Sequence, residues 1–289
     1  MIVDSKSMLL QLGKVRRQCP LTSFYLLFGA FMLMLFPIQS FRTVGTAGFF
    51  YPSKFSGAIH RTAKTMARST SKSLADFREE YSKDEGLDES MVSSTPYPLF
   101  QRWFDDAKNA KVVEPNAMCL STTEPTNGRP SSRYVLLKGF DERGWVWYTN
   151  YESRKGQELS ANPWASLVFW WGDLHRSVRI EGKVEKVSAE ESDEYFYSRP
   201  VGSQLGAMVS TQSRPVQSRS ELEAKFQELT EAAEKNPSSV VRPPHWGGFR
   251  LAADRVEFWH GRSSRLHDRL VYTRPDFESV TWSIERLQP

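Results

Sequence analysis

Residues 117–150 read AMCLSTTEPTNGRPSSRYVLLKGFDERGWVWYTN, and the turn residues within this stretch decide the fold class. Asn127-Gly128 is a preferred two-residue turn between paired strands, and it separates one apolar run from a second at 131–141. Arg143-Gly144 then turns the chain into a third strand at 145–150. Strands joined by such short turns run antiparallel, because parallel strands need a long crossover connection. The stretch therefore predicts an antiparallel sheet.

The flanking sequence continues this series and adds helices at its borders. The stretch 177–187 alternates apolar and polar residues, which indicates a strand with one buried face. Strands are expected at 117–123, 166–171, 177–187, 246–248, 256–259, 270–274 and 280–284. Helices are expected from Pro96, after Asn150, at 188–199 behind a capping box, and from Ser218 to about Lys235. The first of them carries one apolar stripe at the helical spacing, formed by Phe100, Trp103, Phe104 and Ala107. This order favours an α+β fold that is mainly antiparallel β, as a barrel or as a sheet with flanking helices.

The positive charge is concentrated near the start of the chain. Residues 1–75 contain ten Lys or Arg and a single acid, Asp4, which gives them a charge of +9. Since the whole chain carries +4, the remaining 214 residues carry −5. The isoelectric point near 9.0 is therefore no sign of nucleic-acid binding, and no nucleic-acid partner is predicted. Any basic site in the body of the protein must be local.

Sequence motifs exclude several common kinds of site. Cys19 and Cys119 are the only cysteines, so a disulfide framework is excluded. No CxxC or HExxH spacing occurs, and no metal site is predicted. Neither GxGxxG nor GxxxxGK[ST] is present, so dinucleotide-binding and P-loop folds would lack their phosphate-binding loops.

Residues 1–65 have the composition of a leader and are not expected to belong to the fold. The apolar run at 24–38 follows three basic residues, but it has about 15 residues where a membrane-spanning helix needs roughly 20. The stretch 42–75 is rich in Ser, Thr, Arg and Lys, as organellar transit segments are. Three interpretations stay open: a cleavable targeting segment, a membrane anchor, and upstream sequence that the working protein lacks. Membrane contact is expected only for an anchor, and the predicted location is cytoplasmic or mitochondrial.

The segment Trp259–Arg269, WHGRSSRLHDR, concentrates positive charge behind an aromatic side chain. It holds three arginines and two histidines but a single acid, Asp268. Guanidinium groups bind phosphate or carboxylate through two parallel hydrogen bonds, and a histidine exchanges a proton near neutral pH. The segment therefore indicates a site for an anionic, planar ligand, with a solvated basic loop as the alternative.

Several such blocks follow one another along the chain. They are RYVLLKGF at 133–140, YTNYESRKG at 148–156, YFYSRP at 195–200, SQLGA at 203–207, STQS at 210–213, RLHDR at 265–269 and ERLQP at 285–289. In order and approximate spacing they resemble pyridoxamine/pyridoxine 5'-phosphate oxidase over about residues 76–289. The resemblance implies an FMN-binding split β-barrel with flanking helices at 96–289, behind a polar N-terminal arm at 66–95. It also implies a homodimer with flavin contacts from both subunits.

FMN, the cofactor that the resemblance implies, needs basic groups at both ends, because its phosphate is anionic and its ring becomes anionic on reduction. Arg154 and Lys155 begin the helix after Asn150, where side-chain charge and free backbone N–H groups favour a phosphate. Two solvated basic residues are the alternative. The implied flavin contacts are Arg133, Tyr134, Val135, Leu136, Tyr148, Thr149, Arg154, Lys155, Gln212, Ser213, Trp259 and Arg269.

A second phosphate site is expected around the helix that ends before Pro200. Tyr195 and Arg199 are four residues apart, so both should point from one helix face; a core tyrosine and a helix-terminal arginine are the alternative. Arg265 and His267 lie two apart on a segment expected to be extended, which places them on one side. The resemblance implies substrate contacts from Arg78, Tyr81, Lys138, Tyr195, Arg199, Ser203, Arg265, Leu266 and His267, with Arg265 and His267 as the catalytic pair.

The implied reaction is the oxidation of pyridoxine 5'-phosphate and pyridoxamine 5'-phosphate to pyridoxal 5'-phosphate, with O2 as acceptor and H2O2 as product. Ser177 and His260 stand where the family usually has glutamine, and the shorter Ser177 would lose a flavin contact or need a bridging water. A module that binds FMN or pyridoxal phosphate without turnover and another flavin-dependent reductase are the other functions considered. Neither needs the second phosphate site, which favours the oxidase.

Overall fold

The computed structural model describes Tyr81 and residues 86–289. The predicted leader at 1–65 lies outside the described residues, as do Arg78 and most of the predicted arm. The described end of the arm contains one short 3-10 helix, η2 (Glu89–Met91). No helix in the described part of the chain is long and apolar enough to cross a membrane.

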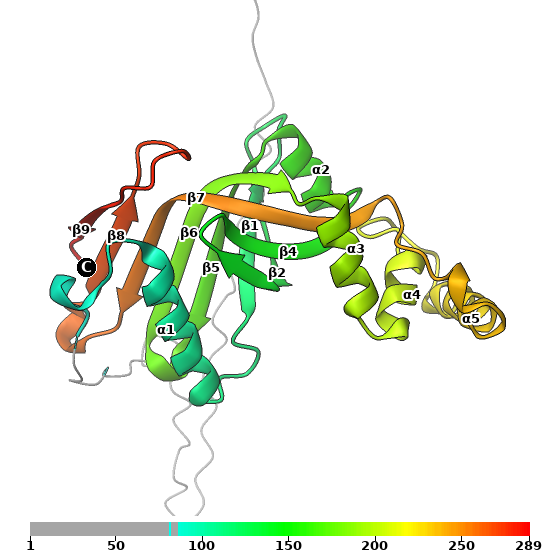
Figure 1. Ribbon diagram of the computed structural model, residues 1–289, viewed down its shortest axis with the longest axis horizontal. Coiled ribbons are helices and arrows are strands. Elements are labelled where there is room, and N and C mark those ends of the chain that lie inside the picture. The colour runs from blue at the N-terminus through cyan, green and yellow to red at the C-terminus, as the bar shows by residue number, and fades with distance from the viewer. Residues whose placement is uncertain (1–80, 82–85) are drawn as a thin grey trace, which may run out of the picture. The chain divides into compact units, whose positions relative to one another are not determined.

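Nine strands of the described chain form one sheet (Figure 1). The strands are β1 (Ala117–Thr123), β2 (Pro130–Leu136), β3 (Gly139–Asp141), β4 (Gly144–Asn150), β5 (Trp164–Trp171), β6 (Arg176–Lys186), β7 (Trp246–His260), β8 (Asp268–Thr273) and β9 (Ser283–Arg286). Seven follow the order β2-β1-β5-β6-β7-β4-β3, and β8 and β9 continue from β7. Every pair is antiparallel, so the prediction from the turns is confirmed.

β7 joins the two parts of the sheet. Residues 246–251 pair with β4 and residues 255–260 pair with β8, while most of the strand also pairs with β6. The expectation of two separate strands here is wrong, because β7 is a single strand of 15 residues. Arg250 interrupts the apolar pattern but is only 6% exposed, and its guanidinium donates to Glu191 Oε1 at 2.7 Å. A register shift opposite Glu181/Gly182 marks a bulge that bends the strand.

Two other strand boundaries differ from expectation. The single strand expected at 131–141 is divided into β2 and β3, because the backbone between them pairs elsewhere. Leu137 N–H donates to the Asn116 carbonyl and Lys138 N–H donates to the Val146 carbonyl. The strand expected at 280–284 is β9, which begins at Ser283.

The described helices flank the sheet and mostly begin where capping residues predict. They are α1 (Pro96–Asn109), α2 (Arg154–Ala161), α3 (Ala189–Ser198), α4 (Val201–Val209) and α5 (Arg219–Lys235), with 3-10 turns η3 (Gly172–Leu174), η4 (Pro237–Ser239) and η5 (Ser263–Arg265). Ser188 and Ser218 cap α3 and α5 as predicted. The sequence did not indicate α4, which begins directly after Pro200. In Figure 1, α3, α4 and α5 lie at the end of the sheet where β7 begins.

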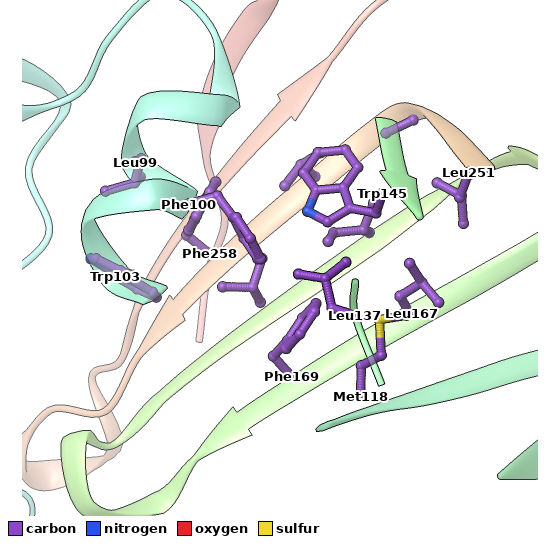
Figure 2. Packing of buried hydrophobic residues seen from close by; sticks show 14 of the residues in the cluster. Leu99, Phe100, Trp103, Met118, Leu137, Trp145, Leu167, Phe169, Leu251 and Phe258 are labelled. Atoms are coloured by element: carbon purple, nitrogen blue, oxygen red, sulfur yellow. The ribbon is translucent and has the colours of Figure 1, made fainter. Parts of the chain in front are cut away.

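The core lies between α1 and the sheet (Figure 2). The apolar stripe predicted for α1 faces it: Phe100 lies edge-on to Trp145 at 5.6 Å and to Phe169 at 5.2 Å between ring centroids. Trp103 lies edge-on to Phe258 at 5.3 Å. All five side chains are nearly or fully buried, so α1 fixes β4, β5 and β7 relative to one another.

Candidate active site

Arg133, Arg154 and Glu158 form an ion-pair cluster where α2 packs against β1 and β2. Glu158 is 2% exposed, and its carboxylate accepts hydrogen bonds from Arg133 Nη2 at 3.1 Å and Arg154 Nε at 2.8 Å. Thr122 Oγ1 donates to the same carboxylate and accepts from Arg133 Nη1. Burial raises the pKa of Glu158, but these hydrogen bonds outweigh it and hold the pKa below its ordinary value. The charged carboxylate therefore fixes two guanidinium groups near the start of α2.

Lys155 lies beside this cluster and reaches a loop far along the chain. Its Nζ donates to Thr149 Oγ1 at 3.0 Å and to Gln212 Oε1 at 2.6 Å, and Thr149 Oγ1 donates to Gln212 at 3.1 Å. Lys155 is only 8% exposed, and burial, with a contribution from the nearby Arg133, lowers its pKa to about 8. Ser153 Oγ caps the first turn of α2 by accepting from Gly156 N–H. The predicted phosphate-binding residues thus come together at a helix start.

The predicted contacts on β2 divide between its two faces. Arg133 and Val135 are half-buried, whereas Tyr134 and Leu136 are exposed, Tyr134 by 80%. Contacts from all four residues to one ligand would have to include backbone atoms. Ser213 is also exposed, with a φ of 70°.

Tyr148, Tyr195 and Trp246 form a stack of three rings where β4 and β7 meet α3. The centroids of Tyr148 and Tyr195 are 4.0 Å apart, and those of Tyr148 and Trp246 are 5.6 Å apart. Gly248, opposite Tyr148 in the sheet, leaves room for the stack, because a Cβ there would lie 2.8 Å from Tyr148 Cε1. Burial, and then the nearby Glu191, raises the pKa of Tyr148 to about 12. The three stacked rings form an aromatic platform.

Two cations lie against this platform. The Arg199 guanidinium carbon is 4.7 Å from the centroid of Trp246, and Lys138 Nζ is 5.9 Å from that of Tyr195. Arg199 Nη2 donates to the Ser203 carbonyl at 2.8 Å, whereas its Nη1 is buried with no hydrogen-bond partner among the described residues. A buried N–H of a cation is a group that an anion would satisfy. Lys138, Tyr195, Arg199 and Ser203 are therefore brought together as predicted.

The predicted reason for their proximity is wrong. α3 ends at Ser198, and Arg199 is an extended C-cap residue with φ −80° and ψ 153°. Arg199 and Tyr195 therefore do not share a helix face. They meet because both pack on Trp246, whose ring is 6.2 Å from that of Tyr195.

Trp259 and Arg269 lie at the other end of β7, as direct partners across β7 and β8. Arg269 Nε and Nη2 each donate to Glu257 Oε1 at 2.8 Å. Ser177 pairs with Trp259 on the β6 side, and its hydroxyl donates to the Phe169 carbonyl at 2.9 Å, so it is bonded to the sheet itself. A pocket of about 370 Å³ opens here, lined by Val168, Trp170, Ser177, Arg179, Glu257 and Trp259.

His267 packs on this tryptophan. Its ring centroid is 4.7 Å from that of Trp259 and 5.6 Å from that of Tyr81. Arg262 N–H donates to His267 Nδ1 at 3.0 Å, so the neutral ring carries its proton on Nε2. Burial, and then the charge of Arg265, lowers the pKa of His267 below its ordinary value. The imidazole is therefore neutral at pH 7.

The expectation that Arg265 and His267 share one side of an extended segment is wrong. Ser263–Arg265 is a 3-10 turn, and Ser264 and Arg265 have positive φ values of 56° and 61°. Arg265 is exposed, and Leu266 is 70% exposed. Their side chains are free to meet a ligand from solvent, but the backbone does not align Arg265 with His267.

These residues form two groups at opposite ends of β7. The first half-site comprises Arg133, Lys138, Tyr148, Thr149, Arg154, Lys155, Tyr195, Arg199, Ser203 and Gln212, and the second comprises Tyr81, Trp259, Arg265, Leu266, His267 and Arg269. Tyr148 pairs with Gly248, and Trp259 lies eleven residues further along the same strand. At about 3.3 Å per residue this is up to about 36 Å of strand. No hydrogen bond, ion pair or ring contact between these described residues links the two half-sites.

Four residues of the site were missed by the sequence reasoning. Glu158 follows Arg154 at the i, i+4 spacing of helical ion pairs, so the sequence alone could have indicated this pair. Trp246 precedes two glycines at the start of a strand. The glycines indicate that another group lies close to the backbone, but they do not predict the stack of Trp246 with Tyr148 and Tyr195. Glu257 and His175, which contacts Tyr81 at 4.4 Å, have no local signal, because their partners are distant in sequence.

Replacing Glu158 by alanine is expected to lower the free energy of unfolding by about 3–5 kcal/mol, since it leaves Arg133 partly buried without its counter-charge. Because the pKa of Glu158 is held down, its contribution is complete above pH 4.5 and is lost as pH falls through the lowered pKa. Chemical denaturation at pH 7 measures the difference, with the exposed Glu152→Ala as the control. A loss no larger than that of the control would contradict the role of the cluster.

Comparison with known proteins identifies the fold and the family. Residues 104–232 match the family described as pyridoxamine 5'-phosphate oxidase, and residues 246–289 match the pyridoxine 5'-phosphate oxidase C-terminal dimerisation region. A pyridoxine/pyridoxamine 5'-phosphate oxidase of Burkholderia lata is 56% identical over 75% of this chain and 99% of its own length. One of Burkholderia multivorans is 55% identical with the same coverage.

Two solved structures share the fold of this chain. PhzG from Burkholderia lata, in complex with tetrahydrophenazine-1-carboxylic acid, has a TM-score of 0.65 and 33% identity, covering 71% of this chain and 98% of its own. A pyridoxamine 5'-phosphate oxidase-related, FMN binding protein of Nostoc punctiforme shares the fold, with a TM-score of 0.56 and 19% identity over 68% of this chain. The expected FMN-binding split β-barrel with flanking helices is confirmed. The chain belongs to the pyridoxamine 5'-phosphate oxidase family of FMN-dependent oxidoreductases.

Proposed function

We propose that the protein oxidises pyridoxine 5'-phosphate and pyridoxamine 5'-phosphate to pyridoxal 5'-phosphate, passing the electrons to O2 and releasing H2O2. The observation that carries the proposal is the presence of two separate anion sites in the first half-site. One is built by Arg133, Arg154 and Lys155, and the other by Lys138 and Arg199 on the aromatic platform. A cofactor phosphate and a substrate phosphate together need two such sites.

The first anion site suits the FMN phosphate. Its residues combine the Lys155 ammonium and two guanidinium groups with the start of α2, where backbone N–H groups favour an anion. Trp259 and Arg269 of the second half-site would hold the flavin ring, with Arg269 supplying positive charge near its polar edge. When bound there, FMN would supply the hydride acceptor for the substrate and the route by which two electrons reach O2.

The second anion site suits the substrate phosphate. The buried Nη1 of Arg199 lacks a partner among the described residues, and the Lys138 ammonium lies against the same rings. His267 and Arg265 would meet the pyridine ring, where the neutral imidazole can donate from Nε2 and orient the substrate. Tyr81 packs on His267 and Trp259 and would exclude water from that side. The protein thus supplies orientation and charge.

A second candidate is the oxidation of a larger planar carboxylic acid, of the class bound by PhzG. It is favoured by Ser177, which leaves space in the pocket beside Trp259. The 5'-phosphate substrates are preferred because Arg199 and Lys138 form a compact anion site on the aromatic platform.

The test of the proposed function measures H2O2 and pyridoxal 5'-phosphate formed from each 5'-phosphate by the FMN-loaded protein. Equal amounts of both products are expected. Arg199→Ala should keep FMN and raise KM by at least about tenfold, since a charge-assisted hydrogen bond is lost. Turnover of tetrahydrophenazine-1-carboxylic acid without turnover of either phosphate would favour the second candidate. FMN binding with no turnover would favour the non-catalytic module.

A homodimer is expected, because one protomer separates the two half-sites along β7 and the chain contains a dimerisation region. The test mixes Lys155→Ala with His267→Ala protein at an FMN concentration that loads the wild-type site but leaves Lys155→Ala largely empty. After subunit exchange about one quarter of the wild-type activity is expected above that of the separate variants, since half the dimers are mixed and each has one intact site. Light scattering measures the dimer directly. An active, FMN-loaded monomer would refute this arrangement.

Deletion of residues 1–65 is expected to leave turnover per bound FMN unchanged, because every predicted site residue lies at position 78 or later. Only location or solubility should change, in accord with a targeting or anchoring role. Steady-state rates of the full-length and shortened chains, normalised to bound flavin, provide the comparison. A shortened chain that folds and binds FMN but fails to turn over would show that the leader takes part in the site.

A further inference from the structure

His175 belongs to a group of four rings around the second half-site. Its ring lies edge-on to Tyr81 with 4.4 Å between the centroids. Tyr81 also lies edge-on to His267 at 5.6 Å and to Trp259 at 6.0 Å. In the described part of the chain these three residues are the ring contacts of Tyr81, and the one with His175 is the shortest.

The backbone at His175 would suit glycine better. Its φ of 50° and ψ of 40° lie in the left-handed region, which a Cβ disfavours and glycine adopts freely. The conformation is fixed from both sides: His175 N–H donates to the Gly172 carbonyl at 2.9 Å, and the His175 carbonyl accepts from Gly261 N–H at 2.8 Å. A side chain retained in an unfavourable conformation points to a use for that side chain.

Gly261 shows how tightly the group is assembled. A Cβ at this position would lie 3.0 Å from His175 Cβ, 3.1 Å from Tyr81 Cγ and 3.2 Å from Trp259 Cη2. The Tyr81 ring therefore packs close to the backbone at Gly261 while it contacts the rings of His175 and His267. Glycine at 261 therefore leaves the space in which His175, Tyr81 and Trp259 come together.

We propose that His175 is a positioning residue that holds Tyr81 against Trp259 and His267, and through Tyr81 sets the retention of the phosphorylated pyridine substrate. The inference rests on the proposed function, in which His267 and Tyr81 face the substrate. His175 itself need not touch substrate or flavin. The His175 imidazole packs against the Tyr81 ring and keeps that ring close to Trp259 and His267.

Full-length protein carrying His175→Gly tests this without endangering the fold, because glycine accepts the left-handed backbone. KM for pyridoxine 5'-phosphate should rise about two- to tenfold, the range for one lost aromatic contact, with kcat and the Kd of FMN little changed. His175→Phe, which keeps a ring against Tyr81, should restore most of the KM. In a Tyr81→Ala background, His175→Gly should have no further effect. Gly261→Ala should raise KM in the same way.

A second readout does not depend on turnover. Trypsin cleavage at Arg78 or Lys83, which flank Tyr81 in the sequence, should become severalfold faster in His175→Gly and return towards the wild-type rate in His175→Phe. If the wild type fails to oxidise either 5'-phosphate, the proposed function fails, and the cleavage rates still decide whether His175 holds Tyr81. Unchanged KM and unchanged cleavage in His175→Gly, or additive effects with Tyr81→Ala, would overturn the inference.

Discussion

Arg265→Ala and His267→Ala are expected to keep FMN bound while kcat/KM falls about ten- to a hundredfold, whereas Arg269→Ala is expected to lose FMN. Arg265 is exposed in the turn η5, and His267 follows the turn as a half-buried residue. Both are proposed to contact the substrate. Each of these two substitutions would remove a hydrogen bond to the substrate. A hydrogen bond that involves a charged group is worth about 1.5–3 kcal/mol. Arg269 lies in β8 directly opposite Trp259, where the flavin ring is proposed to bind.

The measurement combines flavin content after gel filtration with steady-state kinetics. A joint fall in kcat and kcat/KM would mean that the replaced side chain stabilises the transition state. A rise in KM alone would mean that it stabilises the bound substrate and the transition state equally. Excess FMN should partly restore Arg269→Ala. Arg269 also forms a hydrogen bond with Glu257. The thermal stability of Arg269→Ala must therefore be compared with that of Arg219→Ala, a control at an exposed position. Loss of flavin from Arg265→Ala and its retention by Arg269→Ala would reverse the two roles.

Lys155→Ala is expected to weaken FMN binding by about tenfold or more, because it removes a buried ammonium from the phosphate site. The wild type should also show a pH dependence. Since burial lowers the pKa of Lys155 to about 8, this side chain loses its charge above pH 8 in the free protein and must take up a proton to bind the phosphate. The Kd of FMN should rise by up to about tenfold per pH unit above 8 and stay flat below 7.

Flavin fluorescence titrations at several pH values test this, with the exposed Lys183→Ala as the control. Lys155→Ala should lose the rise above pH 8, because the titrating group is gone. Wild-type binding that does not change with pH, together with unchanged affinity in Lys155→Ala, would remove Lys155 from the phosphate site.

Local signals account for what the sequence predicted correctly. The connection at 124–129, which contains Asn127-Gly128, joins antiparallel strands as predicted, although it is longer than a two-residue turn. The serines at 188 and 218 cap their helices, and the stripe around Phe100 is buried as its spacing requires. Lys155 lies in the first turn of a helix, as predicted, because a helix start is visible in the sequence. Its role in binding a phosphate stays a prediction.

Long-range compensation accounts for the errors. β7 was divided in two because Arg250 interrupts its apolar pattern, and its charge is balanced by Glu191, 59 residues away. The segment that holds Arg265 and His267 was expected to be extended, because no sequence pattern predicts the positive φ values of Ser264 and Arg265. Residue spacing also does not reveal which end of a long strand each block occupies, so the separation of the two half-sites along β7 could not be predicted from it.

The most direct test of the central claim is an anaerobic titration of the full-length, FMN-loaded protein with pyridoxine 5'-phosphate. The account predicts that the yellow flavin absorbance bleaches with one equivalent of substrate per flavin, that pyridoxal 5'-phosphate appears, and that air restores the colour with release of H2O2. Flavin that stays oxidised with saturating pyridoxine 5'-phosphate and pyridoxamine 5'-phosphate would contradict it.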